Sequence, residues 1–348
     1  MKIKPLKFFN KKLIPSYTKK FILPMLTPTS KNSKYYDPTP PGKIKMGYIA
    51  SRILQFHQFL SISNSLGIDL NKKKILDLGS GNGLVSKLLC RYSGANEVIA
   101  ADPFFVNENT SSKQQTMTEK EYNKIIRFIE KNNKKNLKFR SYKRYITETA
   151  ESYSFIPGDV IIKKNTKIKP IYKKIDARQI SKLNKTFDII YCKALEHIPD
   201  WKKVFVELAK VSKKGTYIYF KHRSFFSYLG PHRIATLPYP WAHLLLNEKE
   251  YINFVKKNFT ERKKNIIDAY FNGLGYPRVT FNDLIKFASE KGLNLVATQI
   301  ETPSYIDKIS KFTNNIDSFW KLVRKKNSSL SSEEIFSSVY HIVLKKYY

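Results

Sequence analysis

The residues with the clearest chemical potential lie in one short stretch, 75–83. Asp77 closes an apolar run, and glycines follow it at alternate positions, Gly79, Gly81 and Gly83. Glycine lets the backbone turn tightly and approach a bulky ligand without a Cβ in the way. A carboxylate at the head of such a turn repels phosphate and attracts a cation. The stretch therefore predicts a binding site for a ligand with a positively charged end.

Acidic residues also follow later apolar runs. Asp102 ends the run 97–102 and is placed to accept hydrogen bonds from both ribose hydroxyls of an adenosine. Phe104, two residues on, is placed to pack on the adenine ring. Asp176 and Ala177 follow the weaker run 171–175. We interpret Asp102 and Phe104 as the adenosine side of the same binding site, and we expect Asp176 and Ala177 to lie at the same strand ends.

These residues need a scaffold that brings the ends of several strands together. The apolar runs are typical of buried strands, and the apolar-periodic segment 84–89 after the glycines predicts a helix. A strand, a tight turn, a helix and a second strand form a βαβ unit with parallel strands. Open α/β sheets bind ligands at the carboxyl ends of their strands, where all of these residues fall.

Two cofactor classes use this geometry. A dinucleotide site is marked by the spacing Gly-x-Gly-x-x-Gly and places a pyrophosphate at a helix N-terminus. Here the glycines alternate, and Asp77 would repel that anion. S-adenosylmethionine carries a sulfonium and an ammonium group, so it fits this acid better, and a nicotinamide-dependent oxidoreductase is disfavoured.

The motifs resemble those of the class I S-adenosylmethionine-dependent methyltransferases, of the type 11 kind. The resemblance covers residues 48–106, 171–220 and 280–345. It implies a Rossmann-like α/β fold: a seven-stranded, mostly parallel sheet whose last strand is antiparallel, with helices on both faces. It also implies S-adenosylmethionine as the cofactor, bound by Asp77, Gly79, Ser80, Gly81, Gly83, Asp102, Pro103, Phe104, Asp176, Ala177 and Lys193.

Two segments depart from the family's minimal pattern. Residues 106–170 exceed a simple connection between two strands, and we interpret them as an inserted cap or lid. Residues 221–279 predict a substrate loop within a methyltransferase domain that spans 45–348. Before this domain, the Pro-rich basic segment 1–44 predicts an extended N-terminal arm.

Methyl transfer from a sulfonium is an in-line displacement, so the protein mainly aligns the reactants. A base is needed only where the acceptor must lose a proton, and the candidates are His222 and His197. Candidate substrate-binding residues lie in the aromatic segment that follows His222; they are Arg223, Tyr228, His232, Arg233, Trp241 and His243. Each also has a structural alternative, as a packed aromatic or a solvated surface arginine.

The predicted reaction is methyl transfer to an O, N or C atom of a small molecule, a sugar or a lipid-linked metabolite. An RNA methyltransferase and a non-catalytic S-adenosylmethionine-binding protein of the same fold remain alternatives. No metal site is predicted. Cys90 and Cys192 are typical of core thiols.

Charge is the most unusual bulk property. Lys and Arg number 63 against 28 Asp and Glu, which gives a formal net charge of +35. Nucleic acid is a possible partner on this ground, although lysine-rich composition alone produces the same excess. The sequence contains no apolar run long enough for a transmembrane segment, and we expect a cytoplasmic location. The oligomeric state stays open.

Overall fold

A computed structural model gives the structure of the protein. It describes residues 46–104, most of 119–130, 136–137, 160–161, 167–227, 230, 241–258, 263–268, 270–271, 278–302, 316–337 and 339–348. The expected arm 1–44 and most of the expected cap 106–170 lie outside these residues. Within the expected cap, the described residues between 119 and 130 are helical.

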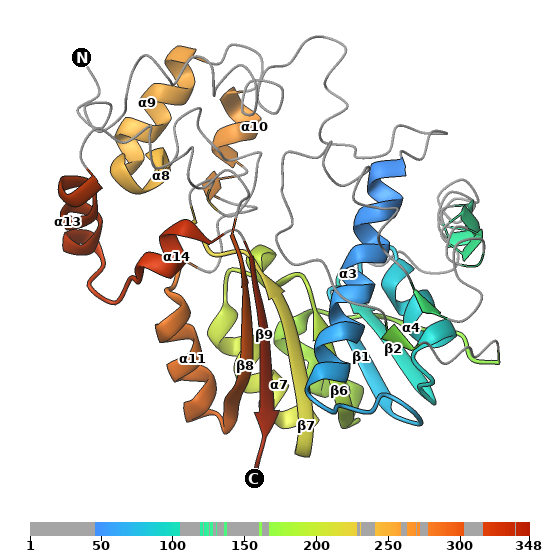
Figure 1. The fold of residues 1–348 in the computed structure, drawn as a ribbon. Coiled ribbons are helices and arrows are strands. Elements are labelled where there is room, and N and C mark those ends of the chain that lie inside the picture. The colour runs from blue at the N-terminus through green and yellow to red at the C-terminus, as the bar shows by residue number, and fades with distance from the viewer. Residues whose placement is uncertain are drawn as a thin grey trace.

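A seven-stranded sheet forms the centre of the molecule, with strand order β5-β2-β1-β6-β7-β9-β8 (Figure 1). Its strands are β1 Lys74–Leu78, β2 Glu97–Asp102, β5 Ile171–Lys174, β6 Phe187–Cys192, β7 Ser212–His222, β8 Leu293–Glu301 and β9 Val339–Lys346. Neighbours from β5 to β7 pair in parallel, whereas β9 is antiparallel to both β7 and β8. The predicted fold class is confirmed, including the antiparallel last strand.

The central strands are buried on both faces, which explains their near-continuous apolar sequences. In β1 only Lys74 is exposed, and in β2 all residues after Glu97 are buried. The edge strands β5 and β8 carry exposed residues along most of their length. This difference explains why the strand signal at 171–175 is weak, because an edge strand does not need a continuous apolar run.

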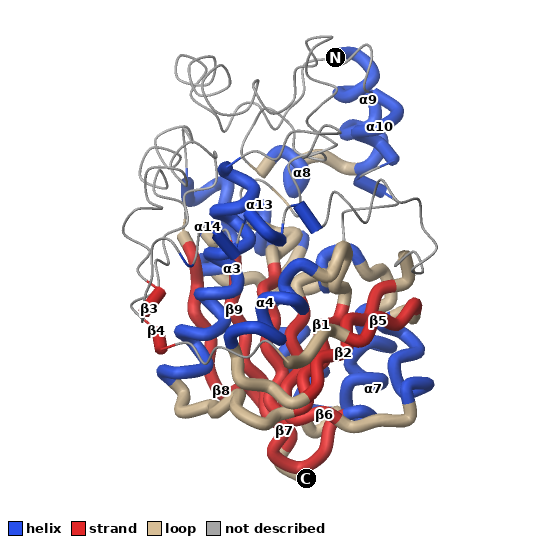
Figure 2. The backbone as a smooth tube through the Cα atoms, turned by 90° about the vertical axis from the view of Figure 1, so that its right-hand side faces the viewer, coloured by secondary structure: helices blue, strands red, loops and turns tan. Residues whose placement is uncertain are grey.

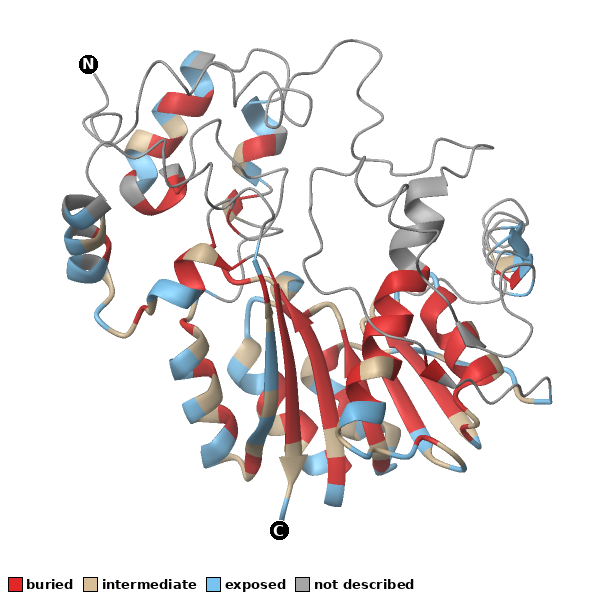
Figure 3. Ribbon diagram, in the orientation of Figure 1, coloured by how far each residue is buried: buried red, intermediate tan, exposed pale blue. Residues whose placement is uncertain are grey.

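Helices cover the two faces of the sheet, as Figure 2 shows with the sheet between them. α3 (Met46–Ser65) and α4 (Leu84–Tyr92) pack on one face, around Phe59, Tyr191 and Tyr219. α7 (Trp201–Val211) and α11 (Phe281–Glu290) pack on the other, around Phe205 and Phe220. The buried residues of Figure 3 follow these two interfaces.

Capping residues set the start of both helices on the second face. The Asp200 carboxylate accepts a hydrogen bond from Lys203 N at the start of α7, as its place before Trp201 predicts. The Thr280 hydroxyl accepts one from Asp283 N at the start of α11. Both helices therefore begin directly after a residue whose side chain caps them.

Shorter elements connect the layers. They are the 3₁₀ helices η5 (Ala177–Leu183) and η6 (Leu195–His197), a small sheet of β3 (Asn136–Leu137) and β4 (Val160–Ile161), and the helices α8 (Ala242–Leu245), α9 (Glu248–Asn258), α10 (Lys263–Asp268), α13 (Ile316–Lys326) and α14 (Ser332–Phe336). Figure 1 shows α8, α9 and α10 beyond the carboxyl ends of the parallel strands. The segment expected to be loop-like after β7 thus contains helical turns.

Candidate functional site

The glycine turn after β1 has backbone conformations that favour glycine. Gly79, Gly81 and Gly83 have φ values of +74°, +56° and +70°. A Cβ on Gly79 would lie 2.2 Å from the Cβ of Ala194, and a Cβ on Gly83 would lie 2.5 Å from the Tyr172 ring. At Gly81 the same space is open, with no atom within 4 Å. The turn is therefore packed against its neighbours at both ends and has free room in the middle.

Asp102 holds this turn in place. Its Oδ2 accepts a 2.9 Å hydrogen bond from Gly81 N, and its Oδ1 accepts one of 2.9 Å from Phe104 N. The carboxylate is 9% exposed, at the end of β2. Its remaining lone pairs are the ones a ribose would use. Pro103 is half-buried beside it, and the Phe104 side chain is 85% exposed.

Asp77 occupies a deeper position than the sequence suggests. The side chain is buried, and its Oδ2 accepts a 2.5 Å hydrogen bond from the Ser86 hydroxyl of α4. It thus ties the end of β1 to the helix that the turn introduces. A negative charge at this position, two residues before the turn, would favour a cationic ligand over an anion.

Asp176 and Ala177 begin η5, at the end of the edge strand β5. Asp176 accepts hydrogen bonds from the Arg178 guanidinium at 2.9 and 2.7 Å and caps η5 through Arg178 N. The hydrogen bonds from Arg178 lower the pKa of Asp176, so this carboxylate is ionised at neutral pH. Ala177 is buried behind it.

The loop after β6 contains the carboxylate of Glu196 and the imidazole of His197, which differ in burial. The Glu196 Oε2 atom is buried and has no hydrogen-bond partner among the described residues, whereas His197 is exposed on η6. Lys193 and Ala194 are half-buried at the start of this loop. Because Ala194 touches the glycine turn, the loop lies directly beside the expected cofactor position.

His222 is the last residue of β7 and is 3% exposed. Burial lowers the pKa of its imidazole to about 4, although the charge of Glu196 acts in the opposite direction. In the described part of the chain, its Nδ1 atom has no hydrogen-bond partner. A buried polar atom left without a partner costs free energy, and it marks a place where a ligand can supply the missing contact.

Among the residues that the structure describes, three of the buried atoms without a hydrogen-bond partner lie on neighbouring elements. Ser80 Oγ follows β1, Glu196 Oε2 follows β6, and His222 Nδ1 ends β7. These strands are adjacent in the sheet and parallel, so their carboxyl ends share one edge. This edge is the one expected to bind the ligand.

Trp241 and His243 have structural partners instead. Trp241 is fully buried, donates a 3.0 Å hydrogen bond from Nε1 to Ile335 O and packs edge-on against Phe336. His243 is bonded through Nε2 to Phe225 O at 2.8 Å, and burial lowers its pKa to about 4. Neither ring has a free face for a substrate. Arg223 is half-buried after β7, and the expected substrate residues Tyr228, His232 and Arg233 lie outside the described residues.

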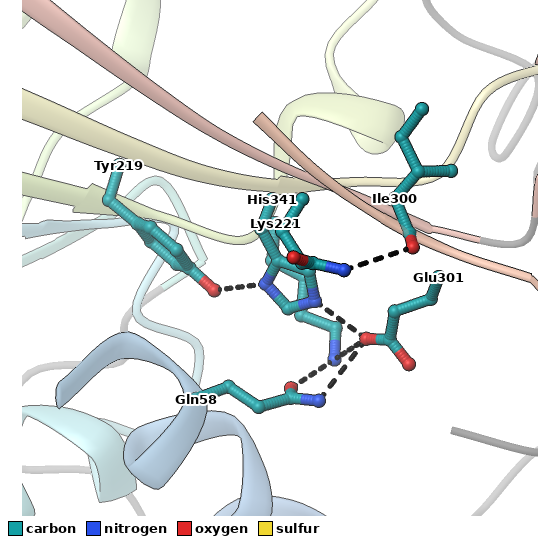
Figure 4. Close-up of polar contacts among 7 residues, drawn as sticks. Gln58, Tyr219, Lys221, Ile300, Glu301 and His341 are labelled. Atoms are coloured by element: carbon teal, nitrogen blue, oxygen red, sulfur yellow. Dashed lines mark hydrogen bonds and ion pairs between the residues drawn. The ribbon is translucent and has the colours of Figure 1, made fainter. Parts of the chain in front are cut away.

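A buried polar cluster at the carboxyl end of β7 was not predicted from the sequence (Figure 4). Glu301 Oε1 receives His341 Nε2 at 2.6 Å, Gln58 Nε2 at 3.2 Å and Lys221 Nζ at 3.4 Å. The Tyr219 hydroxyl lies 2.6 Å from His341 Nδ1. The cluster joins the end of β7 to β8, β9 and α3. Its members are far apart in the chain, so only the pairing of the strands could have revealed it.

The neighbouring groups determine the protonation states of Glu301 and His341. Burial opposes ionisation of Glu301, but the positive charge of Lys221 and the hydrogen bond from His341 outweigh it and lower the pKa of Glu301. Burial also lowers the pKa of His341. A neutral His341 donates a hydrogen bond from Nε2 to Glu301 and accepts one at Nδ1 from the Tyr219 hydroxyl. The cluster is then a lysine–glutamate ion pair with a neutral histidine bridge.

Comparison with known proteins identifies the domain. A family described as a methyltransferase domain matches residues 47–262, more than half of the chain. The chain belongs to this methyltransferase family. Its members use S-adenosylmethionine, so the protein is an S-adenosylmethionine-dependent methyltransferase. No curated protein matches the sequence.

Solved structures that resemble the methyltransferase include a magnesium protoporphyrin IX methyltransferase from Synechocystis with bound SAH. That chain is 11% identical over 95% of this chain and 99% of its own, with a TM-score of 0.42. An S-adenosylmethionine-dependent methyltransferase from Clostridium acetobutylicum is 12% identical over 91% and 98% of the two chains, with a TM-score of 0.40. These similarities say nothing about the methyl acceptor.

The site of the methyltransferase fits its cofactor. Open space at Gly81, the unpartnered Ser80 hydroxyl and the lone pairs of Asp102 lie together where an adenosine with a cationic tail would bind. The described residues contain no cluster of His, Cys, Asp and Glu side chains able to hold a metal ion. None of the helices that the structure describes is long and apolar enough to cross a membrane.

Proposed function

We propose that this methyltransferase acts on an O, N or C atom of a small molecule, a sugar or a lipid-linked metabolite. We place the acceptor at the carboxyl ends of β6 and β7. The observation that carries the proposal is the pair of buried, unpartnered atoms there, Glu196 Oε2 and His222 Nδ1. An acceptor with a hydroxyl or amine group supplies the missing hydrogen bonds. This pair therefore favours an O or N acceptor over carbon.

The cofactor side of the proposal assigns a role to each residue of the strand ends. Asp102 binds the ribose hydroxyls with the lone pairs left by Gly81 N and Phe104 N. The open face of Gly81 lets the ligand approach the backbone. Asp176 and Ala177 face the adenine, and Lys193 borders the site. S-adenosylmethionine supplies a methyl group already activated on a sulfonium.

His222 is suited to the proton transfer that follows. Its pKa of about 4 makes the imidazole neutral at pH 7, so it can accept a hydrogen bond from the acceptor. A hydroxyl becomes strongly acidic as it gains the methyl group, so a weak base is sufficient to take its proton. A methylated amine is an ammonium ion that does not need this base, and its proton leaves to water after the transfer. The nearby carboxylate of Glu196 stabilises the imidazolium that forms.

A turnover assay tests the proposal, with release of S-adenosylhomocysteine measured over a panel of hydroxyl and amine acceptors. We expect His222→Gln to lower kcat by about 10²–10⁴-fold. Its affinity for S-adenosylhomocysteine should stay within about threefold of the wild type. His197→Gln, at the exposed neighbouring histidine, is the matched control and should leave kcat unchanged.

Two outcomes would contradict the proposal. Loss of turnover in His197→Gln but not in His222→Gln would move the catalytic base to η6. Tight binding of S-adenosylhomocysteine without turnover of any acceptor class would support a binding protein of this fold.

A further inference from the structure

The edge of the sheet opposite the cofactor gathers lysines from adjacent strands. They are Lys72, Lys73 and Lys74 at the start of β1, Lys185 before β6, Lys213 and Lys214 at the start of β7, Lys291 before β8, and Lys345 and Lys346 at the end of β9. Because β9 runs antiparallel, its last residues reach the same edge as the first residues of its neighbours. Figure 1 shows this edge at the end of β9. We call these nine residues the basic edge.

The acids on the strands at this edge are already paired. Lys185 Nζ lies 2.9 Å from Glu97 Oε2, and Lys213 Nζ lies 2.8 Å from Asp188 Oδ1. Within the part of the chain that the structure describes, Lys72, Lys74 and Lys214 are exposed and form no ion pair. The local field at the basic edge is therefore strongly positive.

Local backbone structure pushes some of these lysines outward. The pairing of β6 with β7 shifts register between Phe187 and Ile189, and the extra residues of β7 form an exposed bulge at Lys213, Lys214 and Gly215. Gly215 has a φ of +88°, which permits this bulge. The two lysines are therefore exposed at the start of β7.

Exposed aromatic rings accompany the charge. The Tyr347 and Tyr348 side chains are 42% and 89% exposed directly after β9. Lys345 Nζ lies over the Tyr217 ring at 4.8 Å and near the Tyr347 ring at 5.4 Å. Lysines interleaved with exposed aromatic rings form the surface on which single-stranded nucleic acids bind, through phosphate contacts and stacked bases.

We propose that the basic edge binds a single-stranded nucleic acid. The lysines form a row across the five adjacent strands β1, β6, β7, β9 and β8. With about 4.8 Å between strands, this row extends for about 19 Å, the scale of a short single-stranded site. A linear polyanion matches a row of charges, and its unpaired bases are free to stack on Tyr347 and Tyr348. The surface lies at the opposite end of the strands from the cofactor.

This inference goes beyond the proposed reaction and can be tested without turnover. The probe is a fluorescent 12-residue oligouridine, with binding followed by anisotropy at several salt concentrations. The test variant is Lys72→Gln, Lys74→Gln, Lys214→Gln. Its matched control carries the same charge change on α9, with Lys249→Gln, Lys256→Gln, Lys257→Gln, all exposed residues away from the sheet.

We expect the basic-edge variant to bind the probe at least tenfold more weakly than the wild type. Its slope of log K against log salt should fall by about 2, because about 0.7 of a counterion is released for each phosphate contact. The α9 variant should stay within about threefold. Tyr348→Ala should weaken binding by about fivefold or more without changing the slope, since stacking is not electrostatic.

Three results would overturn the inference. The first is an equal loss of affinity in both lysine variants, which would show that the net charge of the protein, and not the basic edge, determines probe binding. The second is absence of probe binding to the wild type at 50 mM salt. The third is that the wild type binds duplex DNA, or vesicles rich in anionic lipid, more tightly than oligouridine and that the basic-edge variant loses this binding. That result would assign the surface to the duplex or to the membrane. Affinity for S-adenosylhomocysteine, measured in parallel, shows that each variant is folded.

Discussion

The backbone N–H of Gly81 donates a 2.9 Å hydrogen bond to Oδ2 of Asp102, and this bond joins the two halves of the cofactor site. One residue belongs to the turn after β1 and the other to the end of β2. The carboxylate thus shapes the turn and, in our proposal, binds the ribose. A substitution of Asp102 disturbs both tasks at once.

Asp102→Asn keeps the shape of the side chain but removes its charge and one of its two acceptor oxygens. Asparagine has one acceptor oxygen, so its amide group would face either Gly81 N or Phe104 N, both of which are donors. A hydrogen bond to a charged group contributes about 1.5–3 kcal/mol. We therefore expect the affinity for S-adenosylhomocysteine, measured by calorimetry, to fall by about 10–100-fold.

Asp188→Asn is the control for this substitution. Asp188 accepts hydrogen bonds from Lys74 N and Lys213 at the far edge of the sheet. The affinity of the Asp188→Asn variant for S-adenosylhomocysteine should equal that of the wild type. Equal losses in the two variants would remove Asp102 from the cofactor site.

Substitution of Gly79 should mainly lower stability, whereas substitution of Gly81 should mainly abolish ligand binding. Gly79→Ala places a Cβ 2.2 Å from that of Ala194, so it should lower the free energy of unfolding by more than 2 kcal/mol. Gly81→Ala meets open space and costs only about 1–2 kcal/mol for the left-handed backbone. Its new methyl group would instead occupy room that the ligand needs, so binding of S-adenosylhomocysteine should be lost.

Thermal unfolding and calorimetry on the same two variants check this pair. A Gly81→Ala protein that binds the ligand normally would show that the cofactor approaches elsewhere. A Gly79→Ala protein of full stability would contradict the close packing of the turn against the loop after β6.

Local sequence was sufficient for the buried parallel strands and for the residues of the glycine turn. These strands need continuous apolar runs, and Asp77 and Asp102 lie at their ends, so the strands and the edge at which they end could be predicted. The number of strands and the antiparallel last strand were expected only from the family resemblance. The partners of the side chains could not be predicted: Asp77 contacts Ser86, Asp176 contacts Arg178, and Trp241 contacts the backbone at Ile335, and these contacts depend on the folded backbone.

The Lys221–Glu301 cluster is another contact that local sequence could not predict, and it gives a further prediction. Glu301→Gln leaves the buried ammonium of Lys221 without its counter-charge, and removal of one partner from a buried pair costs about 3–5 kcal/mol. The double variant Lys221→Met, Glu301→Gln should regain part of this loss. Urea unfolding measures both variants.

Asp188→Asn again provides a comparison, because its ion pair with Lys213 is half exposed. Exposed pairs contribute at most about 1 kcal/mol, so the unfolding free energy should change by no more than that. A Glu301→Gln protein as stable as Asp188→Asn would show that the Lys221 charge finds another partner.

Glu334 should make stability depend on pH near neutrality. Burial raises the pKa of its carboxyl group to about 7, although hydrogen bonds from Ser224 Oγ and Phe281 N act in the opposite direction. A raised pKa means that the folded protein holds the proton more tightly than the unfolded chain. This stabilising contribution is complete below pH 4.5 and is lost as the pH rises through 7. With these two values, the folded protein loses about 2–3 kcal/mol between pH 5 and pH 8 from this group alone.

Glu334→Gln removes the titrating group and keeps an acceptor for Phe281 N. The difference in unfolding free energy between wild type and Glu334→Gln should therefore shift by about 2–3 kcal/mol from pH 5 to pH 8, in favour of the wild type at pH 5. Glu333→Gln, on the exposed neighbour, should shift by less than about 0.5 kcal/mol. Urea unfolding of the three proteins at both pH values makes the comparison. A constant difference between wild type and Glu334→Gln would mean that Glu334 is already ionised at pH 5, held by Ser224 and Phe281 despite its burial.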